Sequence, residues 1–170
     1  ENAANAGIED NATKVYISAG DEKPGYFIIR NNYRPGLAET ISILGAEKQL
    51  HLLSGDNDSE RNNLEQFFGK SGNMHFRQTP ADKLNFIANL QNRKHHVMML
   101  GDGLNDAGAL RQSNAGIAVS DNINNFSPAC DGILDANAFK KIPSFLKFSS
   151  TSMKIIYVSY TISLLYNCIG

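Results

Sequence analysis

The chain has 170 residues, of which 42% are hydrophobic, and its formal net charge at pH 7 is −1. This length is enough for one domain with a single core. The near-zero charge, without any basic run, gives no electrostatic case for nucleic-acid binding. The two cysteines form neither a CxxC pair nor a disulfide framework, so a reducing compartment is the simpler expectation.

The first third of the chain predicts a hairpin followed by a helix. Residues 1–12 are rich in Ala, Asn and Gly and show no periodic pattern, so a weakly ordered lead-in is expected. Two β-rich segments, 14–18 and 25–30, flank a short polar loop and predict a β-hairpin. Apolar residues at i, i+4 and i+7 predict an amphipathic helix over 36–44, with Gly45 placed as its C-cap.

The rest of the chain alternates short apolar runs with helical patterns, which is typical of an α/β fold with a parallel sheet. The predicted strands lie at 50–53, 75–77, 97–100, 116–119 and 133–134. The predicted helices run from Asn57 or Asp58 to Phe68, from Thr79 to about Asn92, over 104–111, and from Pro143 onward. The clearest helix start is Thr79-Pro80, because Asp82 stands three residues after the cap.

The chain is organised around 97–110, where four apolar residues run into Gly101-Asp102-Gly103. This pattern predicts a buried parallel strand that enters a tight loop. Asp102 and Asp106 are four residues apart at the carboxyl end of that strand, where ligands of open α/β sheets bind. Oxygen ligands of this kind suit Mg²⁺ bound together with a phosphate. The alternative is a plain strand-to-helix turn with a capping Asn or Asp.

Two other segments add groups that bind phosphate. The strand 50–53 ends in Ser54-Gly55-Asp56, and the helix that Thr79-Pro80 opens carries Lys83 in its first turn. A hydroxyl, a lysine and a loop with two carboxylates, all at predicted strand or helix ends, indicate a phosphoryl site. The alternative for Lys83 is a solvated helix lysine.

These three motifs, in this order and at this spacing, resemble the phosphorylation domain of P-type ATPases within the haloacid-dehalogenase-like superfamily. The resemblance covers about residues 25–170. It implies a Rossmann-like parallel sheet flanked by helices, an N-terminal β-hairpin and a C-terminal apolar, membrane-type helix. It divides the chain into the end of a nucleotide-binding domain (1–30), a phosphorylation domain (31–150) and the start of a membrane helix (151–170).

The resemblance also implies the cofactors and the metal-binding residues. The cofactors are Mg²⁺ and ATP, the latter bound through a nucleotide-binding domain that is largely absent from this sequence. Asp102 is the first choice as the Mg²⁺ ligand. Asp106 and Asn105 are expected to hold the water molecules on the metal and to orient the loop, with a simple helix cap as the alternative for Asn105.

The remaining site residues are assigned to the phosphoryl group. Lys83 is expected to neutralise the transferred phosphoryl group, and Thr79-Pro80 belongs with it to the cofactor-binding part. The Ser54 hydroxyl and the Gly55 amide are expected to hydrogen-bond the phosphoryl oxygens. Asp56 either caps the next helix or orients the domain, and the sequence does not decide between these roles.

The family's nucleophile is missing from this sequence. It is the Asp of an Asp-Lys-Thr-Gly-Thr motif after an apolar strand, and neither Asp10-Asn-Ala-Thr-Lys14 nor Asp131-Gly-Ile replaces it. We therefore expect a C-terminal part of a longer enzyme, which lacks the central strand of its own sheet. On its own this part is expected to be inactive, because the covalent phosphoenzyme step needs the nucleophile.

The last stretch, 153–170, has Lys154 as its only charge and approaches the lower limit for a membrane span. A buried core helix is the alternative. Lysines just before it fit a cytoplasmic flank. Tyr166-Asn167 resembles the Tyr-Asn pair of copper-transporting members, which contributes to a site for the transported Cu⁺. The alternative is an interfacial Tyr and a helix-packing Asn.

The sequence hypothesis is therefore a fragment of an ATP-driven heavy-metal transporter, with Cu⁺ export as the favoured activity. Its expected partners are the rest of its own polypeptide, the membrane and a metallochaperone, and nucleic acid is not expected. The expected location is a membrane, the bacterial inner membrane being favoured, with this part on the cytoplasmic side. The competing hypothesis is a soluble haloacid-dehalogenase-like phosphatase, or a non-catalytic regulatory module derived from one.

Overall fold

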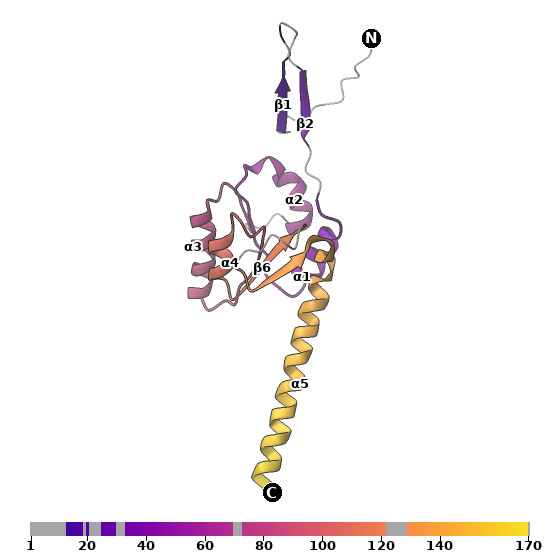
Figure 1. Cartoon of the computed structure of the whole chain (residues 1–170), viewed down its shortest axis with the longest axis vertical. Coiled ribbons are helices and arrows are strands. Elements are labelled where there is room, and N and C mark those ends of the chain that lie inside the picture. Colours follow the sequence, from indigo (N-terminus) through magenta and orange to yellow (C-terminus); the bar gives the residue numbers. More distant parts are fainter. Residues whose placement is uncertain are drawn as a thin grey trace.

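The computed structural model describes residues 13–18, 20, 25–29, 33–69, 73–121 and 129–169 (Figure 1). The expected lead-in, 1–12, lies outside these residues. The described part consists of a β-hairpin, an α/β body and a long C-terminal helix that projects from the body, as Figure 1 shows.

The predicted hairpin is present. Strands β1 (Thr13–Ile17) and β2 (Gly25–Ile29) pair antiparallel, with Ile17 opposite Gly25. The rings of Tyr16 and Tyr26 lie 5.8 Å apart on this hairpin. Tyr16 and Phe27 are about two-thirds exposed, so the hairpin presents apolar surface that the body does not cover.

The α/β body contains two short groups of parallel strands. One pairs β3 (Leu52–Leu53) with β4 (Met74–His75), and the other has the order β5 (Met98–Gly101), β6 (Ala115–Ser120), β7 (Gly132–Asp135). The helical elements are α1 (Leu37–Gly45), η1 (Asp58–Glu60), α2 (Arg61–Phe68), α3 (Pro80–Asn92), α4 (Ala107–Gln112), η2 (Ala136–Lys141) and α5 (Ile142–Ile169). The predicted α/β order and parallel pairing are thus confirmed.

The core lies between the β5–β6 strands and the helices α3 and α4. Its fully buried cluster consists of Ile87, Met99, Ala109, Leu110 and Ala118, with Leu53 of β3 packed against it. A Cβ at position 116 would collide with the carbonyl of Leu110, so glycine is required where α4 crosses β6. This close crossing positions the loop between β5 and α4.

Several predicted boundaries differ from the structure. The helix expected from residue 104 begins at Ala107, because the Asp102 carboxylate accepts hydrogen bonds from the backbone of Leu104 and Asn105 and holds them in a turn. Gly45 is the last residue of α1 and not its C-cap, since Ala46 continues in helical geometry. The strands predicted at 50–53 and 75–77 are two residues long each, at 52–53 and 74–75.

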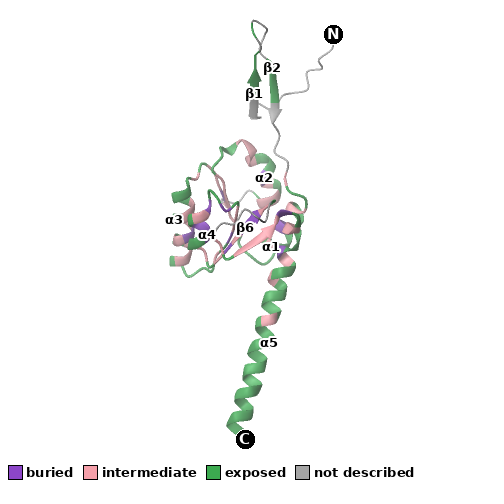
Figure 2. Cartoon of the chain, viewed as in Figure 1, coloured by how far each residue is buried: buried purple, intermediate pink, exposed green. Residues whose placement is uncertain are grey.

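Helix α5 is 28 residues long, and all its residues from 153 to 169 are exposed, as the green ribbon of Figure 2 shows. The alternative of a buried core helix is therefore wrong. Within the described part of the chain, no helix combines the length and the apolar character needed to cross a membrane. The expectation that this stretch already reaches the limit for a span is not met.

Candidate active site

Three connections leave the carboxyl ends of strands in the two parallel sheets. The Ser54–Asp56 segment follows β3, the segment that leads to Lys83 follows β4, and the 102–106 loop follows β5. Open α/β sheets bind their ligands at this edge. The Lys83–Asp106 ion pair joins the second and third motifs, and the Gln78 N–H to Ser54 carbonyl hydrogen bond ties the first motif to the start of α3.

Lys83 and Asp106 form a direct side-chain contact between two of these motifs. The Lys83 Nζ atom lies 2.7 Å from Asp106 Oδ1, and the two side chains are only 12% and 11% exposed. Asp106 stands at the N-cap of α4 but makes no side-chain cap hydrogen bond, so its carboxylate is directed to Lys83 instead. Water screens a pair at this depth less than a surface pair. Lys83 is therefore not the solvated helix lysine of the alternative interpretation.

Glycine is needed at positions 101 and 103 of the loop for two different structural reasons. A Cβ at position 101 would lie 2.7 Å from Asp106 Oδ2, so only glycine leaves room for that carboxylate. Gly103 has a φ of +85°, a backbone conformation that strongly favours glycine. The sequence Gly-Asp-Gly therefore both turns the chain and seats Asp106.

Asp102 is exposed and organises its own loop. Its Oδ1 accepts the backbone N–H groups of Leu104 at 3.0 Å and Asn105 at 3.2 Å, and its Oδ2 accepts the Asn105 side-chain amide at 3.4 Å. The donor set of Asp102, Asn105 and Asp106 consists of carboxylate and carboxamide oxygens, which fits Mg²⁺ held through one or two carboxylates, water and phosphate. In the described ranges, no group of three or more His, Cys, Asp or Glu side chains could hold a metal ion.

The Ser54 hydroxyl belongs to a tight turn. Its Oγ accepts the backbone N–H of Asp56 at 3.1 Å and donates to Asp56 Oδ2 at 3.3 Å. The backbone N–H of Gln78 donates to the Ser54 carbonyl at 2.9 Å, which ties this turn to the start of α3. Asn57, and not Asp56, caps the following helical turn, because its Oδ1 accepts the Ser59 N–H at 3.1 Å. Asp56 therefore acts on the Ser54 turn and not as the cap.

Thr79 and Pro80 fix the start of α3 and thereby the position of Lys83. The Thr79 hydroxyl accepts the backbone N–H of Asp82 at 3.2 Å, and the backbone N–H of Thr79 donates to the Asp82 carboxylate at 2.9 Å, which completes a capping box. The Thr79 hydroxyl also donates to that carboxylate at 2.6 Å. Hydrogen bonds from the Thr79 hydroxyl, and then from its backbone, lower the pKa of Asp82 below its ordinary value. Thr79 and Pro80 are therefore engaged in helix initiation.

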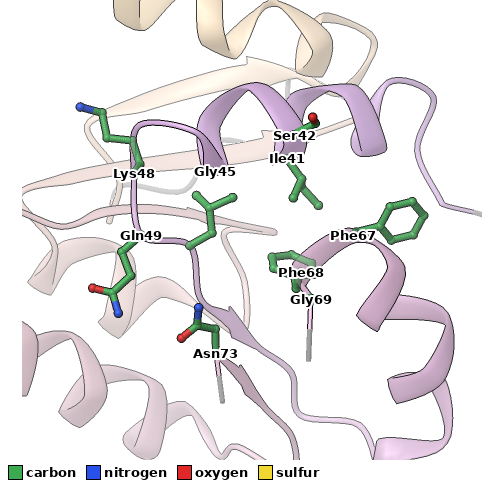
Figure 3. Close-up of a pocket in the computed structure, with 10 residues that line it drawn as sticks. Ile41, Ser42, Gly45, Lys48, Gln49, Phe67, Phe68, Gly69 and Asn73 are labelled. Carbon is green, nitrogen blue, oxygen red and sulfur yellow. The ribbon is translucent and has the colours of Figure 1, made fainter. Parts of the chain in front are cut away.

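Two other features lie away from this edge. Tyr166 and Asn167 lie near the end of α5, far from the body in Figure 1, where Tyr166 is 77% exposed and Asn167 donates to the Ser163 carbonyl at 2.9 Å. A pocket of about 340 Å³ is lined by residues of α1 and α2 and by Lys48, Gln49 and Asn73, as Figure 3 shows. It adjoins the amino ends of β3 and β4, opposite the Ser54 turn.

The sequence did not predict the contacts that attach Tyr33 and Arg34, between the hairpin and α1, to the α/β body. Arg34 donates two hydrogen bonds to Asp121, at 3.0 and 3.3 Å, just after β6 ends. The Tyr33 hydroxyl donates to Glu60 at 2.6 Å, and its ring packs edge-on against Phe67. An acidic residue directly after an apolar strand was the available signal for Asp121, but nothing local identified Arg34 as its partner.

Known proteins with similar sequences place the chain in one family. A family model described as haloacid dehalogenase-like hydrolase matches residues 2–114. The copper-transporting ATPase PAA2 of Arabidopsis thaliana is 34% identical over 164 residues, covering 93% of this chain and 18% of the relative. A copper-transporting ATPase of Helicobacter pylori is 29% identical over 168 residues, covering 95% of this chain and 22% of the relative.

Solved structures show the same fold. A zinc-transporting PIB-type ATPase in its E2.Pi state superposes with a TM-score of 0.72 at 23% identity, over 91% of this chain and 25% of that chain. The catalytic domain of the CPx-ATPase CopB-B gives a TM-score of 0.57 at 22% identity, over 74% of this chain and 49% of that chain.

The chain belongs to the haloacid dehalogenase-like hydrolase family. Its relatives within that family are copper-transporting P-type ATPases, so the resemblance seen in the sequence motifs is confirmed. The chain spans only about a fifth of the length of the two relatives described above.

Proposed function

We propose that this chain is the C-terminal part of the catalytic region of a heavy-metal P-type ATPase that transports Cu⁺. The whole enzyme would couple formation and hydrolysis of an aspartyl phosphate to movement of the metal across a membrane. The observation that supports this most strongly is the shielded Lys83–Asp106 pair, which joins two of the three motifs at the edge where phosphate is expected. The names of the copper-transporting relatives support the choice of metal.

In this proposal each group has one chemical task. Asp102 holds Mg²⁺, with Asp106 and Asn105 orienting the loop around it, and the metal supplies positive charge to the phosphate oxygens. Lys83 adds a second positive charge, whose position Asp106 fixes. The Gly55 amide donates to the phosphoryl oxygens, and the Ser54 hydroxyl would do so after its proton turns away from Asp56 Oδ2. The bond from the Asp56 backbone N–H to Ser54 Oγ would then keep the turn in shape.

The nucleophile would come from outside this sequence. Among the described strands, β3 pairs only with β4 and β5 pairs only with β6, so both have one edge without a partner strand. Leu53 nevertheless packs against the cluster that contains Met99 of β5. A parallel strand that ends in the phosphorylated Asp could pair with these edges and place its carboxylate beside Ser54 and Lys83.

The remaining assignments follow from the same proposal. The exposed apolar hairpin would pack within the nucleotide-binding domain, and α5 would lead toward the membrane part of the enzyme. Tyr166 and Asn167 would then contribute to the path of Cu⁺, which a metallochaperone would supply on the cytoplasmic side. The bacterial inner membrane is the proposed location.

The experiment is to join the chain to an upstream segment from a copper-transporting relative that contains the Asp-Lys-Thr-Gly-Thr motif. Incubation with radiolabelled ATP, Mg²⁺ and Cu⁺ should give an acid-stable phosphoenzyme, and replacing the motif's Asp by Asn should abolish it. A folded protein that forms no phosphoenzyme would refute the proposal. A Cu⁺-independent hydrolysis of small phosphate esters would favour the alternative of a soluble phosphatase, and binding without turnover would favour a regulatory module.

A further inference from the structure

Three aromatic rings form a cluster beneath the candidate site. His51 precedes β3, His75 belongs to β4 and Phe86 lies on α3. The ring centroids of His51 and His75 are 5.8 Å apart, those of His51 and Phe86 5.1 Å, and those of His75 and Phe86 4.6 Å. We call these three residues the imidazole cluster.

The imidazole nitrogens of this cluster are buried without hydrogen-bond partners. This applies to both ring nitrogens of His51 and to Nε2 of His75. A neutral imidazole tolerates such surroundings at a cost, but a protonated one leaves a charged N–H group unsolvated. Burial, followed by the charges of His75 and then of His95, lowers the pKa of His51 below its ordinary value of 6.5.

The groups around His51 do not offset a positive charge. His75 of β4 and His95 from the connection between α3 and β5 are the charges that act on it, and both disfavour its protonation. Phe86 of α3 contributes an uncharged ring. A proton on His51 is therefore accommodated most easily if the rings separate and admit water.

The cluster also connects two motifs of the candidate site. His51 is three residues before Ser54, and Phe86 is three residues after Lys83. The backbone N–H of Ser54 donates to the His75 carbonyl at 2.8 Å, and that of Leu52 donates to the Asn73 carbonyl at 2.8 Å. Separation of the rings would thus loosen the β3–β4 strands from α3 and move the Ser54 turn relative to Lys83.

We propose that the imidazole cluster is a proton-sensitive contact: with His51 neutral, its rings hold β3 and β4 against α3, and protonation of His51 releases them. The release is a property of the fold and does not depend on the proposed ATPase activity. Its effect on phosphoryl transfer rests on the proposed function, so the experiment measures structure and not activity.

The test is amide hydrogen exchange of the full chain, followed from about pH 7.5 to about pH 5 and expressed as protection factors, which remove the intrinsic pH dependence of exchange. The protection of the Leu52 and Ser54 amides should fall in acid. The amide of Asp131, which donates to the Gly116 carbonyl at 2.7 Å, should keep its protection over the same range. An NMR titration of the ring protons should show His51 protonating below pH 6.5.

Two sets of variants distinguish the effect of the imidazole cluster on amide protection from other effects of acid. His51→Phe combined with His75→Phe keeps apolar rings and should abolish the acid loss of protection at Leu52 and Ser54. His96→Phe makes the same change at an exposed neighbour and should leave the loss as in the wild type. The proposal is overturned if the Ser54 amide stays protected while His51 becomes protonated, or if the double variant loses protection as the wild type does.

Discussion

Gly101 lies directly against Asp106, and no space remains between them for a side chain. An ideal Cβ at position 101 would lie 2.7 Å from Asp106 Oδ2 and 2.9 Å from Asp106 Cβ. Because Asp106 is held at its other side by Lys83, a methyl group at position 101 would push against the ion pair itself.

We therefore expect Gly101→Ala to destabilise the fold by about 1–3 kcal/mol, the usual cost of overpacking. Urea unfolding of the full chain measures this. Gly25→Ala is the matched control, because a Cβ at position 25 meets nothing within 4 Å. If both variants unfold at the wild-type midpoint, the carboxylate of Asp106 is not seated as described.

Replacing Lys83 alone should lower the unfolding free energy more than replacing Lys83 and Asp106 together. Lys83→Met leaves a shielded carboxylate without its partner and should cost about 3 kcal/mol in unfolding free energy. Asp106→Leu in addition should recover part of that loss, which a double-mutant cycle measures. Lys147→Met, at an exposed position of α5, should change little. If the losses of unfolding free energy in the single variants Lys83→Met and Asp106→Leu add up to the loss in the double variant, the two side chains are not energetically coupled.

The capping box predicts a local effect at the start of α3. Thr79→Ala should lower the stability by about 1 kcal/mol, since the hydroxyl accepts the Asp82 N–H, and Thr79→Ser should restore it. Thr151→Ala removes a hydroxyl that bonds only to the helix backbone of α5, and it serves as the control. Equal losses at positions 79 and 151 would argue against the box.

Tyr33 predicts a pH dependence in the alkaline range. Burial, then the hydrogen bond to Glu60 and the charge of Glu60, raise the pKa of Tyr33 to about 12 from 10.0. The folded-state pKa is the higher one, so the contribution to stability is complete below pH 10 and is lost as the pH rises toward 12. Ultraviolet titration should show one late phenol, absent in Tyr33→Phe and shifted down in Glu60→Gln. An unchanged titration curve in Tyr33→Phe would assign the late phenol elsewhere.

Much of the fold follows from local sequence patterns. The capping box at Thr79, the apolar run before Gly101 and the hairpin strands were all predicted, because each depends on neighbouring residues. The start of α4 was predicted three residues early, since good helix formers at 104–106 are held by the Asp102 carboxylate. The periodicity of apolar residues does not show where a side chain, such as the Asp102 carboxylate, binds backbone N–H groups and delays the start of a helix.

The partners of the site residues could not be predicted in the same way. The sequence placed Asp106 on the water molecules of a metal, whereas the structure pairs it with Lys83, 23 residues earlier. The Arg34–Asp121 contact spans 87 residues and was not predicted at all. The packing of the half-buried His51 and His75 against Phe86 was not predicted, because it joins three elements that are far apart in the sequence.

The contact between α1 and η2 has a mechanical consequence. An ideal Cβ on Gly36 would lie 2.9 Å from the Cβ of Lys140, so the chain passes from the hairpin into α1 against the same short helix that continues into α5. We therefore expect a tilt of α5 that moves η2 to displace Gly36 and the start of α1.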